Sequence, residues 1–397
     1  MVKDKITNTK DLLVICDSYN NFQKSCIEGV SPFFREITAY VRTNPFAELS
    51  NIIPIPYLAS AKKSNRIDLS GKPENVTVTP TPIFYLPWDR GYKALGKSQY
   101  LVVQKTLKKH NRKFDIVHSQ FTWSAGYVGA RLKEKFEVPF VVTARGYDIY
   151  SLPFMDEGWR ERIEYVLNTA DYITTVSQSN LYHINRLNVS APVSVVYNGF
   201  RTDFFYPRDT IECRRLLHLP SDQKVILTVG NLVPVKGHQF LIDAIDRIAD
   251  ERDDILCIIV GAGVLERSLR EKIHSLGLEH TVVLMGGKPH SSIPIWMNAC
   301  DIFVLPSLNE GNPNVMFEAL GCGKPFVGTT VGGIPEIITS ERFGLLVEPQ
   351  DSDDLAKKIL IALDREWDPR VITEYAAQFS RDKMIDKMID IYCRFLS

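Results

Sequence analysis

The sequence lacks the features that mark a secreted, membrane-spanning or strongly charged protein. The N-terminus has no apolar stretch of signal-peptide length, and no run approaches the roughly 20 apolar residues that span a bilayer. The 47 Lys and Arg residues are balanced by 47 Asp and Glu residues, which excludes a strongly basic nucleic-acid-binding protein. We therefore expect a cytoplasmic protein that does not bind nucleic acid.

Disulfide, metal-binding and cofactor patterns are missing as well. The seven cysteines are odd in number, scattered, and contain no C-x-x-C pair, so reduced thiols fit better than a disulfide framework or a zinc site. Gly261-Ala-Gly263 follows an apolar run as in a dinucleotide-binding loop, but Glu266 stands where that pattern needs a third glycine. We therefore expect no metal and no cofactor.

What the sequence does contain is the pattern of an α/β protein. Its 397 residues suggest two or three domains. Short β-branched runs alternate with longer amphipathic stretches in both halves, which predicts two doubly wound domains, each with a parallel sheet covered on both faces. The expected strands cover residues 12–16, 115–118, 140–143, 172–176, 224–229, 256–260, 282–285 and 302–305.

The boundary between these domains is expected near residues 200–222, where turn residues replace apolar periodicity. The first domain then covers residues 1–205 and the second covers residues 206–380. Residues 44–87 are rich in Pro, Ser, Lys and Asn and are interpreted as long loops. Residues 381–397 form an amphipathic stretch that predicts a terminal helix.

Charge is divided unevenly between the two halves. Residues 1–200 carry 25 Lys and Arg against 18 Asp and Glu, a net charge of +7, and the remainder carries −7. Either the first half meets an anionic partner, or the halves face each other. A basic run is interpreted as a solvated helix face, with contact to anionic lipid at the inner face of the plasma membrane as the alternative: Lys105, Lys108, Lys109, Arg112 and Lys113.

The densest group of polar residues follows the strand expected at 302–305. Glu310 lies in the loop after it, and the amides within 311–314 would begin a helix whose start attracts phosphate or sugar oxygens. Glu318 lies about one turn further and can face the same edge, where open α/β sheets bind ligands. The spacing of the two glutamates is equally compatible with a ligand-binding role and with a purely structural role.

At this point the sequence resembles glycosyltransferase family 4. Glu310 and Glu318 match the paired-glutamate motif of retaining glycosyltransferases with the GT-B fold, within E-G-x-P-N-x-x-x-E-A-L. Residues 229–237 are similar to the family's V-G-R-L-x-x-x-K-G, and residues 331–336 to its G-G-x-P-E. Residues 196–199 are similar to its interdomain N-G. Together these motifs are specific, although each alone would be weak.

The resemblance implies two Rossmann-like domains that face a central cleft. The N-terminal domain would bind a saccharide or lipid-linked acceptor, the C-terminal domain a UDP- or GDP-sugar, and the final helix would pack back onto the first domain. The implied reaction is a retaining, metal-independent hexosyl transfer to an acceptor hydroxyl, in cell-surface polysaccharide, glycolipid or glycoconjugate synthesis. A GT-B epimerase or phosphorylase, or a non-catalytic sugar-nucleotide sensor, are the alternatives.

The resemblance also assigns roles to residues of the second domain. Lys236 would stabilise charge on the leaving diphosphate, Glu310 would hold the donor sugar, and Glu318 would accept hydrogen bonds from the ribose hydroxyls. The loop at 286–290 would read the base through its backbone. The donor-binding residues implied by the motifs are Asn231, Lys236, Gly237, Lys288, Glu310, Gly311, Asn312, Pro313, Asn314 and Glu318.

Two positions depart from the family pattern. Asn231 stands where relatives usually carry Arg, and Arg145 stands where they often carry the His of T-x-H-G-x-D. We hypothesise that Arg145 is a catalytic residue that supplies the missing positive charge to the donor or to an anionic acceptor. A structural pairing of Arg145 with Asp148 is the alternative.

The other acceptor-side candidates are polar or small residues near the ends of strands in the first domain. His118 is one of these candidates, but the sequence is at least as compatible with a structural histidine at the end of a strand, whose hydrogen bonds are satisfied within the protein. These candidates are Asp17, Ser18, Gly29, His118 and Asp148.

Overall fold

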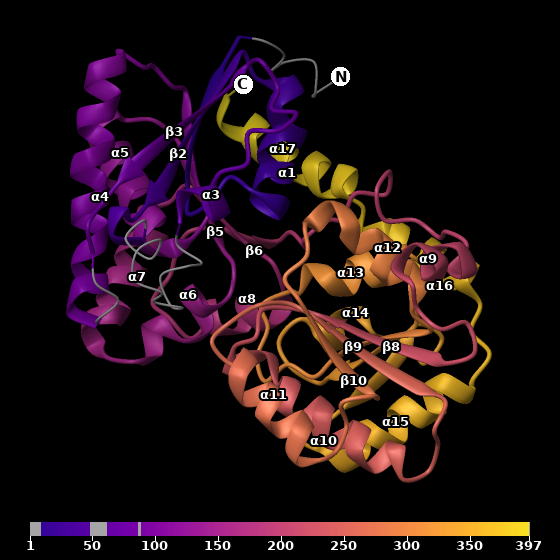
Figure 1. The fold of residues 1–397 in the computed structure, drawn as a ribbon. Coiled ribbons are helices and arrows are strands. Elements are labelled where there is room, and N and C mark those ends of the chain that lie inside the picture. Colours follow the sequence, from indigo (N-terminus) through magenta and orange to yellow (C-terminus); the bar gives the residue numbers. More distant parts are fainter. Residues whose placement is uncertain (1–8, 48–61, 86–88, 397) are drawn as a thin grey trace. The chain divides into compact units, whose positions relative to one another are not determined.

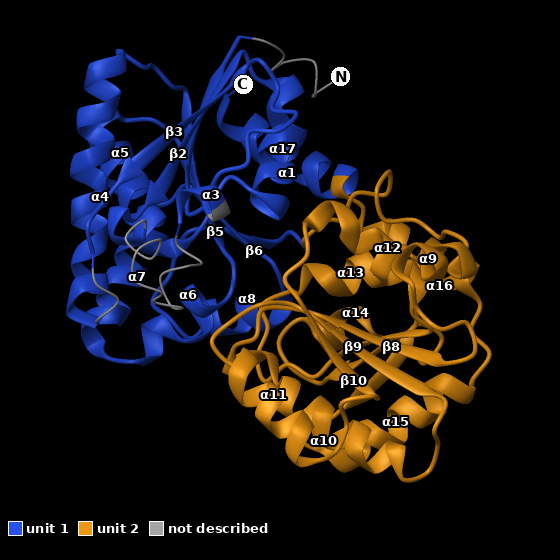
Figure 2. Cartoon of the chain, in the orientation of Figure 1, with its two compact units in different colours: residues 1–197, 382–397 blue, residues 198–381 orange. Residues whose placement is uncertain are grey.

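The structure is a computed structural model that describes residues 9–47, 62–85 and 89–396 (Figure 1). It forms two compact units, one made of residues 1–197 with 382–397 and the other of residues 198–381 (Figure 2). The units divide a few residues before the expected boundary at residue 205, and almost all of the terminal helix belongs to the first unit.

The first unit is built on a seven-stranded sheet in the order β3-β2-β1-β4-β5-β6-β7, with every pair parallel. The order reverses between β1 and β4, so the carboxyl ends of these strands form the edge at which open α/β sheets bind ligands. The strands are β1 (Asp11–Cys16), β2 (Glu36–Thr43), β3 (Val76–Pro82), β4 (Ile116–Ser119), β5 (Phe140–Ala144), β6 (Tyr172–Thr175) and β7 (Val193–Val195).

Helices cover both faces of this sheet because side chains alternate along each buried strand. Leu12 and Val14 of β1 pack toward α1 and α17, whereas Leu13 and Ile15 pack toward α4, α5 and α7. Figure 1 shows these two groups of helices on opposite sides of the sheet. The helices are α1 (Asn21–Val30), α3 (Lys63–Arg66), α4 (Asp89–His110), α5 (Tyr127–Phe136), α6 (Tyr147–Tyr150), α7 (Glu157–Thr169), α8 (Gln178–Ile184) and α17 (Arg381–Leu396). Shorter turns are η2 (Ser31–Phe33), η4 (Thr122–Gly126) and η5 (Leu152–Phe154).

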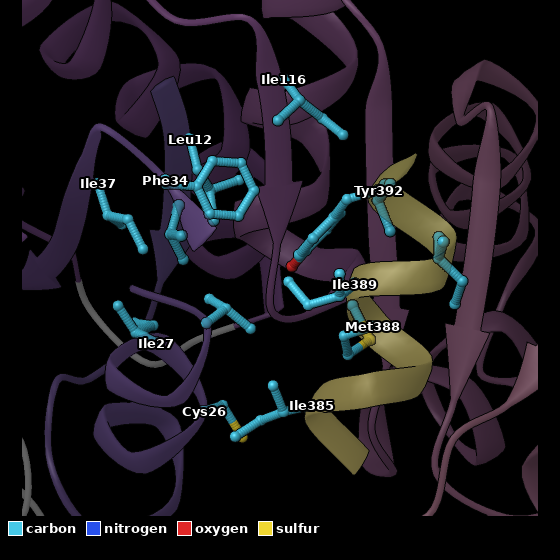
Figure 3. Close-up of a cluster of buried hydrophobic side chains, with 14 of the residues drawn as sticks. Leu12, Cys26, Ile27, Phe34, Ile37, Ile116, Ile385, Met388, Ile389 and Tyr392 are labelled. Atoms are coloured by element: carbon cyan, nitrogen blue, oxygen red, sulfur yellow. The ribbon is translucent and has the colours of Figure 1, made fainter. Parts of the chain in front are cut away.

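The terminal helix α17 completes the core of the first unit. Its side chains at Ile385, Met388, Ile389 and Tyr392 point into a buried cluster with residues of α1 and the sheet (Figure 3). The Tyr392 ring lies edge-on to Phe34 at a centroid distance of 5.6 Å. The last helix of the chain therefore closes one face of the first sheet.

The second unit is built on a six-stranded sheet in the order β10-β9-β8-β11-β12-β13, again with every pair parallel. Its strands are β8 (Lys224–Val229), β9 (Ile255–Val260), β10 (Val282–Gly286), β11 (Ile302–Leu305), β12 (Phe326–Thr329) and β13 (Gly344–Val347). Its helices are α9 (Thr210–Leu217), α10 (His238–Ala249), α11 (Glu266–Ser275), α12 (Ile293–Ala299), α13 (Asn314–Gly321), α14 (Ile334–Ile337), α15 (Ser352–Asp364) and α16 (Pro369–Ala376). Three short turns are η6 (Pro234–Lys236), η7 (His290–Ser292) and η8 (Ala377–Phe379).

The prediction of two doubly wound α/β domains is confirmed, but the strands β2, β12 and β13 are not among the expected ones, and two other segments differ from their interpretation. The stretch 44–87, interpreted as loops, contains β3, whose two prolines are tolerated because β3 is an edge strand. Residues 48–61 of that stretch lie outside the described residues. The boundary stretch contains α9, which has little apolar periodicity. The buried Arg214 anchors this helix through an ion pair with Asp301, at 2.6 Å.

Helix α4 carries most of the basic run. Lys105, Lys108 and Lys109 are exposed, whereas Arg112, just beyond the helix, pairs with Glu36. Among the helices that the structure describes, none is long and apolar enough to cross a bilayer. Because these three lysines are exposed, the basic face of α4 lies on the surface of the first unit.

A buried hydrogen-bond network joins α17 to the sheet through His118. Its Nδ1 lies 2.6 Å from the Tyr392 hydroxyl and its Nε2 lies 2.7 Å from the Thr143 hydroxyl. His118 is 3% exposed, and burial lowers its pKa to about 3. Both ring nitrogens are satisfied within the protein, which matches the structural alternative for this histidine.

This burial predicts that the first unit loses stability in mild acid. Because the folded pKa of His118 is lowered below the unfolded value of about 6.5, the unfolded chain binds the proton first, and stability falls as the pH drops from about 6.5 toward 3. Between pH 7 and pH 5 this costs about 2 kcal/mol of unfolding free energy.

We expect His118→Gln to remove that part of the pH dependence, measured by urea unfolding at both pH values. His110→Gln, which changes an exposed histidine at the end of α4, is the matched control and should behave as the unaltered protein. An unchanged pH dependence in His118→Gln would show that His118 is not the group responsible.

Candidate active site

A lysine and a glutamate meet at the carboxyl edge of the second sheet. Lys236 ends the turn η6 after β8, and Glu310 lies in the loop after β11. Lys236 Nζ lies 2.5 Å from Glu310 Oε1, and the Ser307 hydroxyl donates to the same oxygen at 2.7 Å. Glu310 is 9% exposed, so this charge pair is only weakly screened by water. The edge of the sheet therefore holds an ordered cation beside an ordered carboxylate.

Close backbone contacts at glycines fix this pair in place. A Cβ on Gly332 would lie 1.7 Å from the Glu310 carbonyl oxygen, and the Gly333 amide donates to the Gly311 carbonyl at 3.0 Å. Gly237, with φ +64°, would place a Cβ 2.0 Å from the Pro306 carbonyl oxygen. The glycines of the K-G and G-G-x-P-E motifs are thus required because neighbouring loops pack backbone to backbone.

Helix α13 begins directly after this loop. Pro313 is its N-cap residue and Asn314 its first residue, so the amide groups at its start lie beside Glu310 in the sequence. The Asn198 side-chain amide, from a distant part of the same unit, donates to the Asn312 carbonyl at 2.9 Å and holds the loop in place. Residues 311–314 therefore form a constrained helix start, which favours oxygen ligands of anions and sugars.

The second carboxylate of the motif, Glu318, lies in α13 and is 7% exposed. His290, at the start of η7, places Nε2 at 3.0 Å from Glu318 Oε1. Because a carboxylate only accepts hydrogen bonds, this contact places the proton on Nε2. The sequence analysis missed this side chain, since it expected only the backbone of residues 286–290 to take part.

Two other donor-side candidates, Asn231 and Lys288, differ in their surroundings. Asn231 is exposed, and its backbone carbonyl lies 3.2 Å from His238 Nε2. Burial lowers the pKa of His238 to about 4, so this ring is neutral at pH 7 and adds no charge. Lys288 Nζ lies 5.7 Å from the centre of the Trp296 ring. Neither Asn231 nor His238 replaces the cation that the V-G-R-L pattern would supply.

The glycine pair after β9 also has a packing role. A Cβ on Gly261 would lie 1.8 Å from the Gly230 carbonyl oxygen, and one on Gly263 would lie 2.4 Å from the Leu232 carbonyl oxygen. These glycines let the loops after β8 and β9 pack together. Their resemblance to a dinucleotide-binding loop is therefore explained by the packing of this edge.

The chain contains one Asp-x-Asp triplet, at residues 351–353, which is the pattern of a metal–diphosphate clamp. In the structure Asp351 caps α15, with its carboxylate accepting from the Asp354 amide at 2.8 Å, and Asp353 pairs with Arg247. Both outer carboxylates of the triplet thus have structural partners.

In the first unit, Arg145 follows β5 and reaches across the neighbouring strand end. Its Nε donates to the Gln120 carbonyl at 3.0 Å, and its guanidinium lies 5.0 Å from the centre of the Phe22 ring. Asp148 accepts from the backbone amide of Arg145 at 3.1 Å. Burial lowers the pKa of Arg145, as expected for a partly desolvated cation.

The other acceptor-side candidates occupy different environments. Asp17 follows β1 and accepts from Arg42 Nη2 at 2.8 Å, and the Ser18 amide donates to Gln23 at 3.2 Å. Gly29 lies within helix α1 rather than in an open turn. The sequence analysis missed Arg42, although its place at the end of a strand next to β1 puts it beside Asp17.

Asp148 organises the turn after β5. Its carboxylate accepts from the amides of Thr122 and Gly146, both at 2.8 Å, and burial raises its pKa. It therefore shapes the loop that carries Arg145. The structure brings Asp17, Arg145 and Asp148 to the same carboxyl edge of the first sheet, and buries His118 below it.

Comparison with known proteins gives matches along most of the chain. Residues 209–379 match the family described as glycosyl transferases group 1, and residues 56–204 match glycosyltransferase family 4. Glycosyltransferase MJ1178 of Methanocaldococcus jannaschii is 31% identical over 277 residues, covering 69% of this chain and 73% of that protein. The D-inositol 3-phosphate glycosyltransferase of Mycolicibacterium smegmatis is 29% identical over 301 residues, covering 72% and 68%.

Solved structures show the same fold at lower identity. Sucrose-phosphate synthase from Thermosynechococcus elongatus has a TM-score of 0.79 at 20% identity, covering 97% of this chain and 99% of that one. Anabaena HepE in complex with UDP-glucose has a TM-score of 0.74 at 20% identity, covering 97% and 100%. The paired sheets, the paired glutamates and these matches agree, and the chain belongs to the family 4 glycosyltransferases with the GT-B fold.

Proposed function

We propose that this protein is a retaining, metal-independent hexosyltransferase. It takes a sugar from a UDP- or GDP-sugar and attaches it to a hydroxyl of a saccharide or lipid-linked acceptor, without a cofactor. The observation that carries the proposal is the ion pair between Lys236 and the buried Glu310 beside the start of α13, with Glu318 on the same helix. A UDP complex of a neighbour with the same fold supports a nucleotide-sugar donor.

Each donor-site residue has a role that follows from its chemistry. The Lys236 ammonium attracts the diphosphate, and the amides at the start of α13 attract oxygens of the donor. Glu310, held by Ser307, accepts hydrogen bonds from hydroxyls of the sugar. Glu318 accepts hydrogen bonds from the ribose.

In the proposed reaction, the bond between the anomeric carbon and the diphosphate oxygen breaks while the acceptor oxygen bonds to the same face of that carbon. The acceptor's proton passes to an oxygen of the departing phosphate. Lys236 stabilises the negative charge that develops on the diphosphate. The protein contributes position and charge.

The first unit is proposed to bind the acceptor at the carboxyl edge of its sheet. Arg145, held by Gln120 and Phe22, offers a partly desolvated cation to an anionic group there. We propose that the exposed lysines of α4 contact anionic lipid, so that the enzyme would act at the inner face of the plasma membrane. We propose that the enzyme takes part in the synthesis of a cell-surface polysaccharide, glycolipid or glycoconjugate.

The donor assignment predicts that one nucleoside diphosphate stabilises the protein. In a thermal-shift panel of UDP, GDP, ADP, CMP and NAD, we expect a shift with UDP or GDP, since a ligand at 100 times its Kd adds about 2.7 kcal/mol. Glu318→Ala should lose most of that shift. Absence of any shift with UDP and GDP would contradict the donor assignment, and a shift with NAD alone would indicate a different activity.

The charge assignment predicts a loss of turnover in Lys236→Met. Removing one stabilising group from the transition state should lower kcat by about 100-fold to 1,000-fold in steady-state assays. Lys272→Met, which removes a lysine paired with Asp243 in the same unit, is the matched control. A kcat for Lys236→Met within threefold of the control would exclude the proposed role.

The acceptor assignment predicts an effect on the other substrate in Arg145→Gln. With an anionic acceptor, kcat/KM for that acceptor should fall by about 10-fold to 100-fold, whereas the Kd of the nucleotide stays within twofold. Arg131→Gln, in an exposed ion pair on α5, controls for the loss of an arginine. An unimpaired kcat/KM in Arg145→Gln or Arg145→Ala would contradict this role.

A further inference from the structure

His290 and Glu318 are in contact at the donor edge, the carboxyl edge of the second sheet where the donor is proposed to bind. None of the family motifs explains this contact. His290 comes from η7, at the end of the loop after β10, and Glu318 from α13. These elements belong to the same unit, and the contact joins Nε2 and Oε1 at 3.0 Å. The Glu318 side chain is 10% exposed and that of His290 is 34% exposed.

Two aromatic rings fix the orientation of the imidazole. The Phe204 ring stacks on His290 with centroids 5.8 Å apart and an interplanar angle of 27°, and the Phe205 ring meets it edge-on at 5.5 Å. Phe205 is 2% exposed, so this support is part of the core. The imidazole is therefore held before any ligand arrives.

The backbone of His290 is fixed in the same way. Pro289 precedes the turn, and both the amide and the hydroxyl of Ser292 donate to the Pro289 carbonyl at 2.9 Å. The turn continues directly into α12. A histidine fixed in both backbone and ring is suited to hold another side chain in one rotamer.

The contact uses only one of the two oxygens of Glu318. His290 binds Oε1, and the described part of the chain places no hydrogen bond on Oε2. A carboxylate anchored through one oxygen presents the other in a fixed direction, where it can accept from a hydroxyl donor. Glu310 shows the same arrangement, since Lys236 and Ser307 share its Oε1.

We propose that His290 is a positioning residue of the nucleotide subsite, which holds Glu318 so that its second oxygen meets the ribose diol of the donor. This inference rests on the proposed function, because it assumes a nucleoside diphosphate in the second unit. It adds a side chain whose effect reaches the ligand only through Glu318.

Two substitutions separate this role from simple packing. His290→Phe keeps an aromatic ring beside Phe204 and Phe205 but removes the N–H donor, whereas His290→Gln keeps an N–H donor. His274→Phe, which changes an exposed histidine on α11, is the matched control. The probes are UDP and 2′-deoxy-UDP, measured by calorimetry, together with steady-state kinetics for the UDP-sugar; the GDP series replaces them if GDP is the ligand.

We expect His290→Phe to raise the Kd of UDP about tenfold and to leave that of 2′-deoxy-UDP within twofold, because the deoxy compound lacks the diol. In His290→Phe, KM for the donor should rise while kcat stays within twofold of that of the unaltered protein. His290→Gln should recover most of the affinity. In a Glu318→Ala background, His290→Phe should have no further effect.

An equal loss of affinity for UDP and 2′-deoxy-UDP would overturn the inference, because His290 would then act on the base, the phosphates or the loop itself. Unchanged binding of UDP by His290→Phe would overturn it as well, while leaving the donor site intact. Failure of the unaltered protein to bind either UDP or GDP would instead overturn the proposed function, and this inference with it.

Discussion

The carboxyl edge of the second sheet depends on the compensation of two buried carboxylates by neighbouring side chains. A carboxylate removed from water is costly unless a cation or a set of donors compensates it. Glu310 has Lys236 and Ser307, and Glu318 has His290. Each glutamate is thus stabilised by its own chain through one carboxylate oxygen. The glycine contacts around Glu310 serve this arrangement, since they bring the loops close enough for one lysine to reach it.

The two units use the same kind of sheet edge differently. In the second unit, the edge carries paired acids and a helix start, a combination suited to a sugar and its diphosphate. In the first, Arg145 and the Asp17–Arg42 pair gather at the strand ends. The same kind of sheet therefore presents different side chains at its edge in each unit, because these side chains follow the ends of the strands.

The α/β fold could be predicted from periodicity because buried parallel strands are nearly continuous apolar runs. The short or proline-containing strands β3, β12 and β13 gave too weak a signal, and α9 is held by an ion pair rather than by an apolar stripe. Glu310, Glu318 and Lys236 could be found from motifs, since their spacing is local. His290, Ser307 and Arg42 could not, because their importance comes from contacts made only when the chain folds.

The most direct test of this account is to map nucleotide protection along the chain by hydrogen–deuterium exchange with UDP, and separately with GDP. The account predicts slower exchange at residues 230–238, 286–292 and 307–318, which form the donor edge of the second unit. Protection confined to the first unit, or confined to residues 261–266, would contradict the claim that the paired glutamates and Lys236 form the donor site.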